Sequence, residues 1–205
     1  MSGFPESSTS SATWRLFDAA TRATADRMTT WSGGAISLEL DGIVCVPMHE
    51  LFEHVPGADR LATLVLIEAE GDIGGILTLL FDDASLGKFL ERISGVPVSS
   101  EELSELHESV LMETGNILAS AFTGTICEQS GYLVLPSPPT LLRDYALSVL
   151  EQASFDQAMT HDQLVLSRTR FEKDGETLDW QLIFVPNSAM RAWLDEADQT
   201  QTTSL

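Results

Sequence analysis

The stretch SELHESVLMETGNILASAFTG, residues 104–124, carries the strongest fold signal in this chain. Its apolar side chains recur every three or four residues, which predicts one long amphipathic helix. At about 100° per residue, four polar side chains fall in one narrow stripe: Ser109, Glu113, Asn116 and Ser120. An apolar face is predicted roughly 100° round from this stripe, made of Leu103, Leu106, Val110, Ile117 and Ala121. We therefore expect a carboxylate and a carboxamide side by side on an exposed flank of an anchored helix.

The middle of this predicted helix contains three weak helix formers in a row, Thr114, Gly115 and Asn116. Glycine alone costs a helix about 1 kcal/mol relative to alanine. A local inconsistency inside an otherwise consistent element is where a functional site is expected. Because Gly115 has no side chain, we expect it to let the backbone of another molecule approach beside Asn116.

The spacing of four residues resembles the active-site signature of the CheC/CheX/FliY family of chemotaxis phosphatases. That signature is Asp or Ser, x3, Glu, x2, Asn, x22, Pro, and it is matched by Ser109, Glu113, Asn116 and Pro139. The flanking stretches ETGNILASAF and LVLPSPP are also family-like, and the resemblance covers about residues 12–196. It implies an α+β, CheC-like fold that is duplicated about a pseudo-two-fold axis. A central, mainly antiparallel β-sheet would carry two long helices on one face.

The resemblance also implies an activity: hydrolysis of the aspartyl-phosphate of a CheY-type response regulator in chemotaxis signalling. In such a protein phosphatase, Asn116 would orient the attacking water and Glu113 would dock the helix on the lysine of the receiver's active site. Ser109 would support them through a hydrogen bond to Glu113 or to the partner, and Pro139 would shape the loop beside the helix. No metal-ligand set is visible in the sequence, so we expect no cofactor of its own; Mg²⁺ would come with the receiver.

Alternating and periodic segments predict further elements along the chain. We expect a disordered tail at 1–11 and a flexible tail at 197–205 around a single domain, 12–196. The predicted helices are 12–30, 49–54, 83–93, 141–153 and 188–197, and residues 99–102 are expected to cap the signature helix. The predicted strands are 35–40, 43–46, 61–68, 73–81, 131–135, 163–171 and 177–184, with turns at 71–72 and 173–175 and a loop at 136–139.

The predicted element order repeats, which indicates two pseudo-repeats of about 12–97 and 98–196. Pro47 then occupies the place of Pro139. The signature spacings counted back from Pro47 reach three residues that do not match it: Thr24, Thr21 and Phe17. The first half is therefore expected to keep the scaffold and to lack the chemistry. This favours a CheC-type double fold with one intact site.

The composition excludes several classes of partner. A net charge of −20 argues against nucleic acid or an anionic membrane, because both need basic patches. The acidic surface fits either salt adaptation or steering toward a basic partner. The sequence has no apolar run that could span a membrane and no secretory signal. Its two cysteines, Cys45 and Cys127, form no disulfide framework, so a cytoplasmic protein is expected.

Two readings compete with the enzyme. The fold could be a non-catalytic binding module for a phosphorylated receiver or a CheD-like deamidase, or an adaptor related to the flagellar switch. Glu113 and Asn116 could also be ordinary surface residues. His107 is expected to be a packed histidine. Gly74-Gly75 is expected to mark a bulge or a place of close packing.

Overall fold

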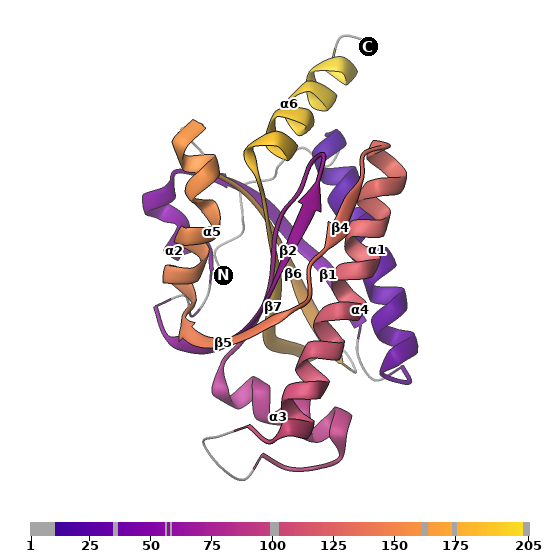
Figure 1. The fold of residues 1–205 in the computed structure, drawn as a ribbon, viewed down its shortest axis with the longest axis vertical. Coiled ribbons are helices and arrows are strands. Elements are labelled where there is room, and N and C mark those ends of the chain that lie inside the picture. Colours follow the sequence, from indigo (N-terminus) through magenta and orange to yellow (C-terminus); the bar gives the residue numbers. More distant parts are fainter. Residues whose placement is uncertain are drawn as a thin grey trace.

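The computed structural model describes residues 11–34, 37–55, 57, 59–98, 103–160, 164–173 and 176–202. Its elements are shown in Figure 1. The first half contains α1 (Ala12–Trp31), β1 (Ser37–Val46), η1 (Met48–Glu50), α2 (Leu51–His54), β2 (Leu61–Gly71), β3 (Gly75–Phe81) and α3 (Asp83–Ser94). The second half contains α4 (Glu105–Ser130), β4 (Val134–Pro136), β5 (Thr140–Tyr145), α5 (Ala146–Thr160), β6 (Leu164–Lys173), β7 (Glu176–Pro186) and α6 (Ser188–Thr202).

The strands form one seven-stranded sheet in the order β1-β6-β7-β3-β2, with β4 and β5 both pairing with β2 at the far edge. Every pairing between its strands is antiparallel. The two central strands pair from Gly75 opposite Pro186 to Phe81 opposite Trp180. The predicted α+β fold with a mainly antiparallel sheet is therefore confirmed.

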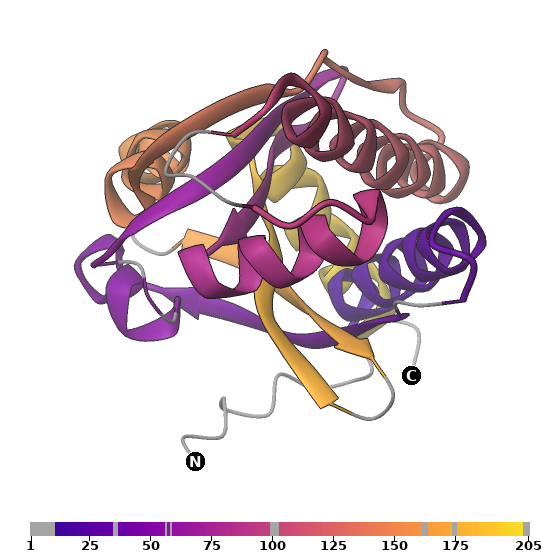
Figure 2. The ribbon, with the colours of Figure 1, turned by 90° about the horizontal axis from the view of Figure 1, so that it is seen from below.

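The order of the elements is the same on both sides of the central β3–β7 pair. From that pair outward lie β2 and then β5 on one side, and β6 and then β1 on the other. Each half begins with a long helix, α1 or α4, and α3 and α6 follow the two central strands. Figure 2 shows α1 and α4 next to each other on one side of the sheet and α5 on the other.

The sheet is covered on both faces, and the larger core lies under α1 and α4. There Phe17, Phe122 and Phe184 meet, with ring centroids between 5.0 and 6.2 Å apart. A smaller core lies on the other face, where Ala146 and Leu150 of α5 pack with Ile183 and Val185 of β7. Burial on both faces explains why the central strands are almost continuously apolar.

Close backbone packing accounts for the glycine pair Gly74-Gly75 at the start of β3. A Cβ on Gly74 would lie 2.0 Å from the carbonyl oxygen of Ala69, and a Cβ on Gly75 would lie 2.3 Å from that of Val185. Only glycine leaves room for these approaches. The predicted close packing is confirmed, although the strand begins at Gly75 rather than at residue 73.

The sequence predicted a helix over 141–153, and this prediction is wrong for residues 141–145. Residues Thr140–Tyr145 form β5, which pairs with β2 from Leu66 opposite Thr140 to Leu61 opposite Tyr145, and α5 begins only at Ala146. Pairing at the sheet edge satisfies the backbone of β2 and overrides the local pattern. The two strands predicted at 35–40 and 43–46 are one strand, β1, with an irregularity between Leu40 and Gly42.

The ends of several elements also differ from the prediction. Helix α4 is capped by Ser104, whose side chain accepts a hydrogen bond from the backbone N–H of His107, and it continues to Ser130. Helix α6 continues to Thr202, so the predicted tail from 197 is helical up to that residue. Asp198 accepts hydrogen bonds from Thr13, which joins the end of α6 to the start of α1. Parts of other predictions fall on residues outside the described ranges: 1–10, 35–36, 99–102, 163, 174–175 and 203–205.

Candidate functional site

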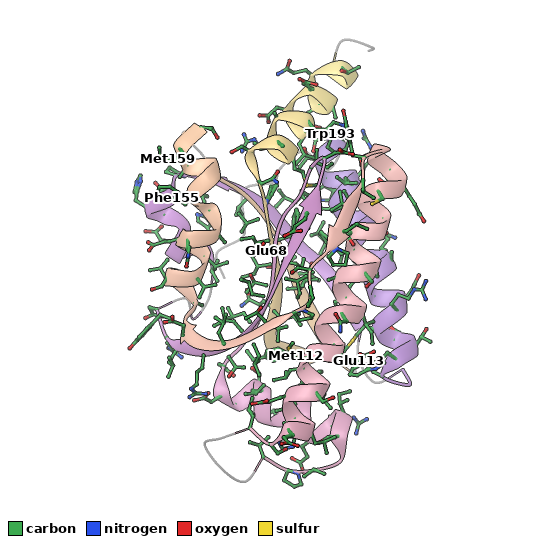
Figure 3. All side chains as sticks on the ribbon, in the orientation of Figure 1. Glu68, Met112, Glu113, Phe155, Met159 and Trp193 are labelled. Atoms are coloured by element: carbon green, nitrogen blue, oxygen red, sulfur yellow. The ribbon has the colours of Figure 1, made fainter. Side chains whose placement is uncertain are left out.

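The polar stripe of the sequence is an exposed ridge along α4. Ser109, Glu113, Asn116 and Ser120 are all exposed, each about one turn of helix from the next. Glu113 is labelled on this helix in Figure 3. Helix α4 lies on the sheet and α1 lies next to it, so the ridge belongs to a firmly anchored element.

The face of α4 that is buried differs from the predicted apolar face. It consists of His107, Leu111, Thr114, Gly115, Leu118, Ala119, Phe122, Thr123 and Ile126. Leu106, which was predicted to be on the apolar face, is 51% exposed, and Val110 and Ile117 are only half-buried. Two threonines can enter the core because Thr114 and Thr123 donate their hydroxyl hydrogens to the carbonyls of Val110 and Ala119. Sorting the residues of α4 by polarity alone therefore predicted the wrong buried face.

Gly115 faces the sheet and not a partner molecule. A Cβ at this position would lie 2.9 Å from Cγ1 of Val65 and 3.3 Å from Cγ of Pro139. The expectation that Gly115 admits the backbone of another molecule is therefore wrong. The missing side chain instead allows α4 to approach β2 closely, one residue before Asn116.

Pro139 is buried between α4 and the edge of the sheet. The loop before it is fixed to β2, because Ser137 donates its backbone N–H to the carbonyl of Glu68 and accepts the N–H of Glu68 on its hydroxyl. The proline ring thus packs against the inner side of α4, while the signature side chains lie on the outer side. This location fits a role in placing the helix, and it gives Pro139 no exposed reactive group.

Among the residues that the structure describes, the ridge side chains find no partner. In the described part of the chain, Ser109, Glu113 and Asn116 make no side-chain hydrogen bond or ion pair. The hydrogen bond from Ser109 to Glu113, one of the two roles expected for Ser109, is therefore not formed here. An exposed carboxylate and an exposed carboxamide, one turn apart, are free to bind another molecule.

Counting residues back from Pro47 did not find the true counterpart of this site in the first half. Phe17, Thr21 and Thr24 are at most 2% exposed and cannot correspond to exposed ridge residues. The burial patterns of α1 and α4 match instead when residues 98 apart are paired: Leu16 with Thr114, Phe17 with Gly115, Ala20 with Leu118, Thr21 with Ala119, Thr24 with Phe122, and Met28 with Ile126. Counting back from Pro47 failed because β4 lies between α4 and β5, whereas no described strand lies between α1 and β1.

With this pairing, Arg15 takes the place of Glu113 and Asp18 takes the place of Asn116. Asp18 already accepts a hydrogen bond from the guanidinium of Arg22 at 2.8 Å. A cation thus stands where the ridge of α4 has its carboxylate. By either pairing, the first half has neither the glutamate nor the asparagine of the signature.

The remaining polar candidates have structural partners. His107 is 3% exposed, and its Nε2 lies 3.2 Å from the carbonyl oxygen of Val96, so the predicted packed histidine is confirmed. The described residues contain no group of three His, Cys, Asp or Glu side chains that could hold a metal ion. Nor does any described helix combine the length and apolar character that crossing a membrane requires.

The sequence matches that of a known chemotaxis protein. No family model matches the chain. The CheY-P phosphatase CheC of Bacillus subtilis (strain 168) is 23% identical to it over 137 residues. The match covers 65% of this chain and 66%, just under two thirds, of CheC.

Solved structures share the fold at low sequence identity. FliY of Thermotoga maritima has a TM-score of 0.67 at 15% identity, covering 91% of this chain and 93% of the FliY chain. FliM of Helicobacter pylori, solved in complex with SpeE, has a TM-score of 0.64 at 11% identity, covering 93% and 95%. CheX of Borrelia burgdorferi, solved in complex with CheY, BeF3 and Mg, has a TM-score of 0.56 at 13% identity, covering 84% and 98%. Together with the match to CheC, these likenesses show that the chain has the fold of the CheC/CheX/FliY-type proteins.

Proposed function

We propose that this protein hydrolyses the aspartyl-phosphate of a CheY-type receiver domain. The observation that carries the proposal is the pair of unpartnered side chains, Glu113 and Asn116, on the exposed ridge of α4. The match to a CheY-P phosphatase and the fold shared with a CheX that was solved with CheY support it. Such a protein would act in the cytoplasm, where its receiver is.

Asn116 is the residue that acts on the attacking water. A carboxamide can accept a hydrogen bond from that water through its oxygen and donate one through its nitrogen. Water held in line with the phosphorus forms the new P–O bond while the bond to the aspartyl oxygen breaks. The products are the free aspartate carboxylate and inorganic phosphate, which keeps both protons of the water. Asn116 takes no proton, because positioning and charge stabilisation dominate this class of reaction.

Glu113 docks the helix on its substrate. It precedes Asn116 by one turn, about 4.5 Å along the helix axis. Its exposed carboxylate pairs with the lysine ammonium of the receiver's active site, which brings Asn116 over the phosphoryl group. The Mg²⁺ that neutralises charge on that group belongs to the receiver, that is, to the substrate.

The anchoring of α4 makes this geometry reproducible. Gly115 and Pro139 hold the inner side of the helix at close distance from β2, so the backbone that carries the outer side chains keeps a fixed position. A misplacement of about 1 Å can cost an enzyme roughly 100-fold in rate. Both residues therefore support the site through its position and not through contact with the phosphoryl group.

The alternative is a binding module without turnover, which the likeness to FliM favours. Such a module would still bind an activated receiver through the ridge. The two functions are separated by following the decay of a phosphorylated receiver with catalytic amounts of the protein. Multiple turnovers support the phosphatase, whereas binding without faster decay supports the module.

A further inference from the structure

The ridge of α4 begins with a large apolar side chain that neither the proposed chemistry nor the core uses. Leu106 is 51% exposed. It precedes Ser109, Glu113 and Asn116 by three, seven and ten residues, and these helical spacings place it on the same ridge. It lies two turns before Glu113, about 10.5 Å along the axis. Farther along the ridge, the positions after Asn116 are small or polar, Ser120 and Gly124.

A second apolar side chain is held at the same end of α4. Val96 is 44% exposed, and its carbonyl oxygen lies 3.2 Å from Nε2 of the buried His107, the residue that follows Leu106. Ser94 accepts the N–H of Val96 on its hydroxyl and donates to the carbonyl of Leu90. The segment between α3 and α4 is thus tied to both helices at this point, and Val96 is presented in a fixed position.

A single exposed leucine on a protein surface is ordinary. Two features distinguish Leu106: it lies on the same ridge as Glu113 and Asn116, and a second exposed apolar residue, Val96, is held at the same end of α4 by the buried His107. Interfaces commonly have an apolar centre surrounded by polar groups. On a chain with a net charge of −20, apolar contact also provides affinity that salt does not screen.

We propose that Leu106, assisted by Val96, is the apolar anchor with which α4 binds the receiver domain. This inference rests on the proposed function and specifies how its substrate is held. Leu106 would pack on an apolar part of the receiver's surface next to its active site, while Glu113 and Asn116 reach the phosphoryl group. The receiver would then lie over the N-terminal half of α4.

The experiment compares Leu106→Ala with Leu135→Ala in steady-state hydrolysis of a phosphorylated receiver. Leu135 is a matched control, because it is 56% exposed and lies on β4. Leu106→Ala is expected to raise KM roughly five- to tenfold, with kcat within about twofold of wild type, since the lost apolar contact is made equally in the bound complex and the transition state. Val96→Ala should raise KM roughly two- to threefold, and Leu135→Ala should not change it. Alanine favours helix, so the first variant retains α4.

Equal KM values for the Leu106 and Leu135 variants would overturn the proposal that Leu106 is an anchor. A fall in kcat at unchanged KM for Leu106→Ala would overturn it too. Titration of the beryllofluoride-activated receiver provides a second reading that does not depend on turnover. If wild type binds without hydrolysing, the proposed enzyme fails, and a roughly five- to tenfold weaker Kd for Leu106→Ala alone still supports the anchor. If wild type neither binds nor hydrolyses any CheY-type receiver, both proposals are overturned.

Discussion

Replacing Gly115 by alanine tests how closely α4 lies on the sheet. In an open helix this change stabilises by about 1 kcal/mol, because alanine is the better helix former. Here the new methyl group would lie 2.9 Å from Cγ1 of Val65, 3.3 Å from Cγ of Pro139 and 3.4 Å from Cδ1 of Ile67. Val65 and Ile67 are buried and β-branched, and the proline ring is rigid, so little of this crowding can be relieved by rotation.

Overpacking of this kind costs about 1–3 kcal/mol. Set against the gain in helix propensity, Gly115→Ala should lower the free energy of unfolding by about 1 kcal/mol. The control is Gly124→Ala, nine residues later in the same helix, where a Cβ would meet nothing within 4 Å. That variant should raise the free energy of unfolding by roughly 0.5–1 kcal/mol.

The assay is urea unfolding followed by circular dichroism, with the two variants beside wild type. The expected difference between them, about 1.5–2 kcal/mol, corresponds to a few degrees in Tm for a chain of this size. The relief of crowding should also move α4 outward, so Gly115→Ala should reduce kcat more than Gly124→Ala does. Equal stabilisation by both changes would refute the close approach of α4 to β2 and the positioning role given to Gly115 and Pro139.

Three further predictions concern the ridge and its surroundings. Glu113→Gln should raise KM for the phosphorylated receiver roughly tenfold in steady-state assays, because the charge on the docking group is lost, while Glu128→Gln, an exposed change near the end of α4, should not. Arg15→Ala combined with Asp18→Ala should leave turnover within about twofold of wild type; a larger loss with unchanged stability would mean that α1 also binds the receiver. If the acidic surface steers a basic face of the partner, kcat/KM should fall several-fold between about 50 and 500 mM salt, whereas a purely solubilising surface predicts only the smaller fall that comes from screening the Glu113–lysine pair.

The sequence predicted the exposed ridge well, because the periodicity of a long helix is a strong signal. It did not predict which side of that helix is buried. Thr114 and Gly115 looked like signs of a functional flank, yet both lie against the sheet, where Thr114 satisfies its hydroxyl on its own helix and Gly115 leaves room for Val65. The spacing of residues along a helix cannot predict which of them contacts a strand elsewhere in the fold.

The edge of the sheet was the other element that local reasoning missed. Leu141 and Leu142 fit a helical pattern as well as a strand, and only pairing with β2 decides between the two. The position of β4 between α4 and β5 also made the two halves unequal in length, so counting from Pro47 led to buried residues of α1. Burial patterns, which come from the fold, gave Arg15 and Asp18 as the counterparts.

The most direct test follows the decay of a ³²P-labelled CheY-type receiver with catalytic amounts of wild type, Asn116→Ala and Ser120→Ala. Ser120 is the control, because it is exposed on the same ridge one turn beyond Asn116. The account predicts faster decay with wild type and Ser120→Ala, and a loss of roughly 100-fold or more with Asn116→Ala at unchanged stability. Acceleration by Asn116→Ala equal to that of wild type would contradict it.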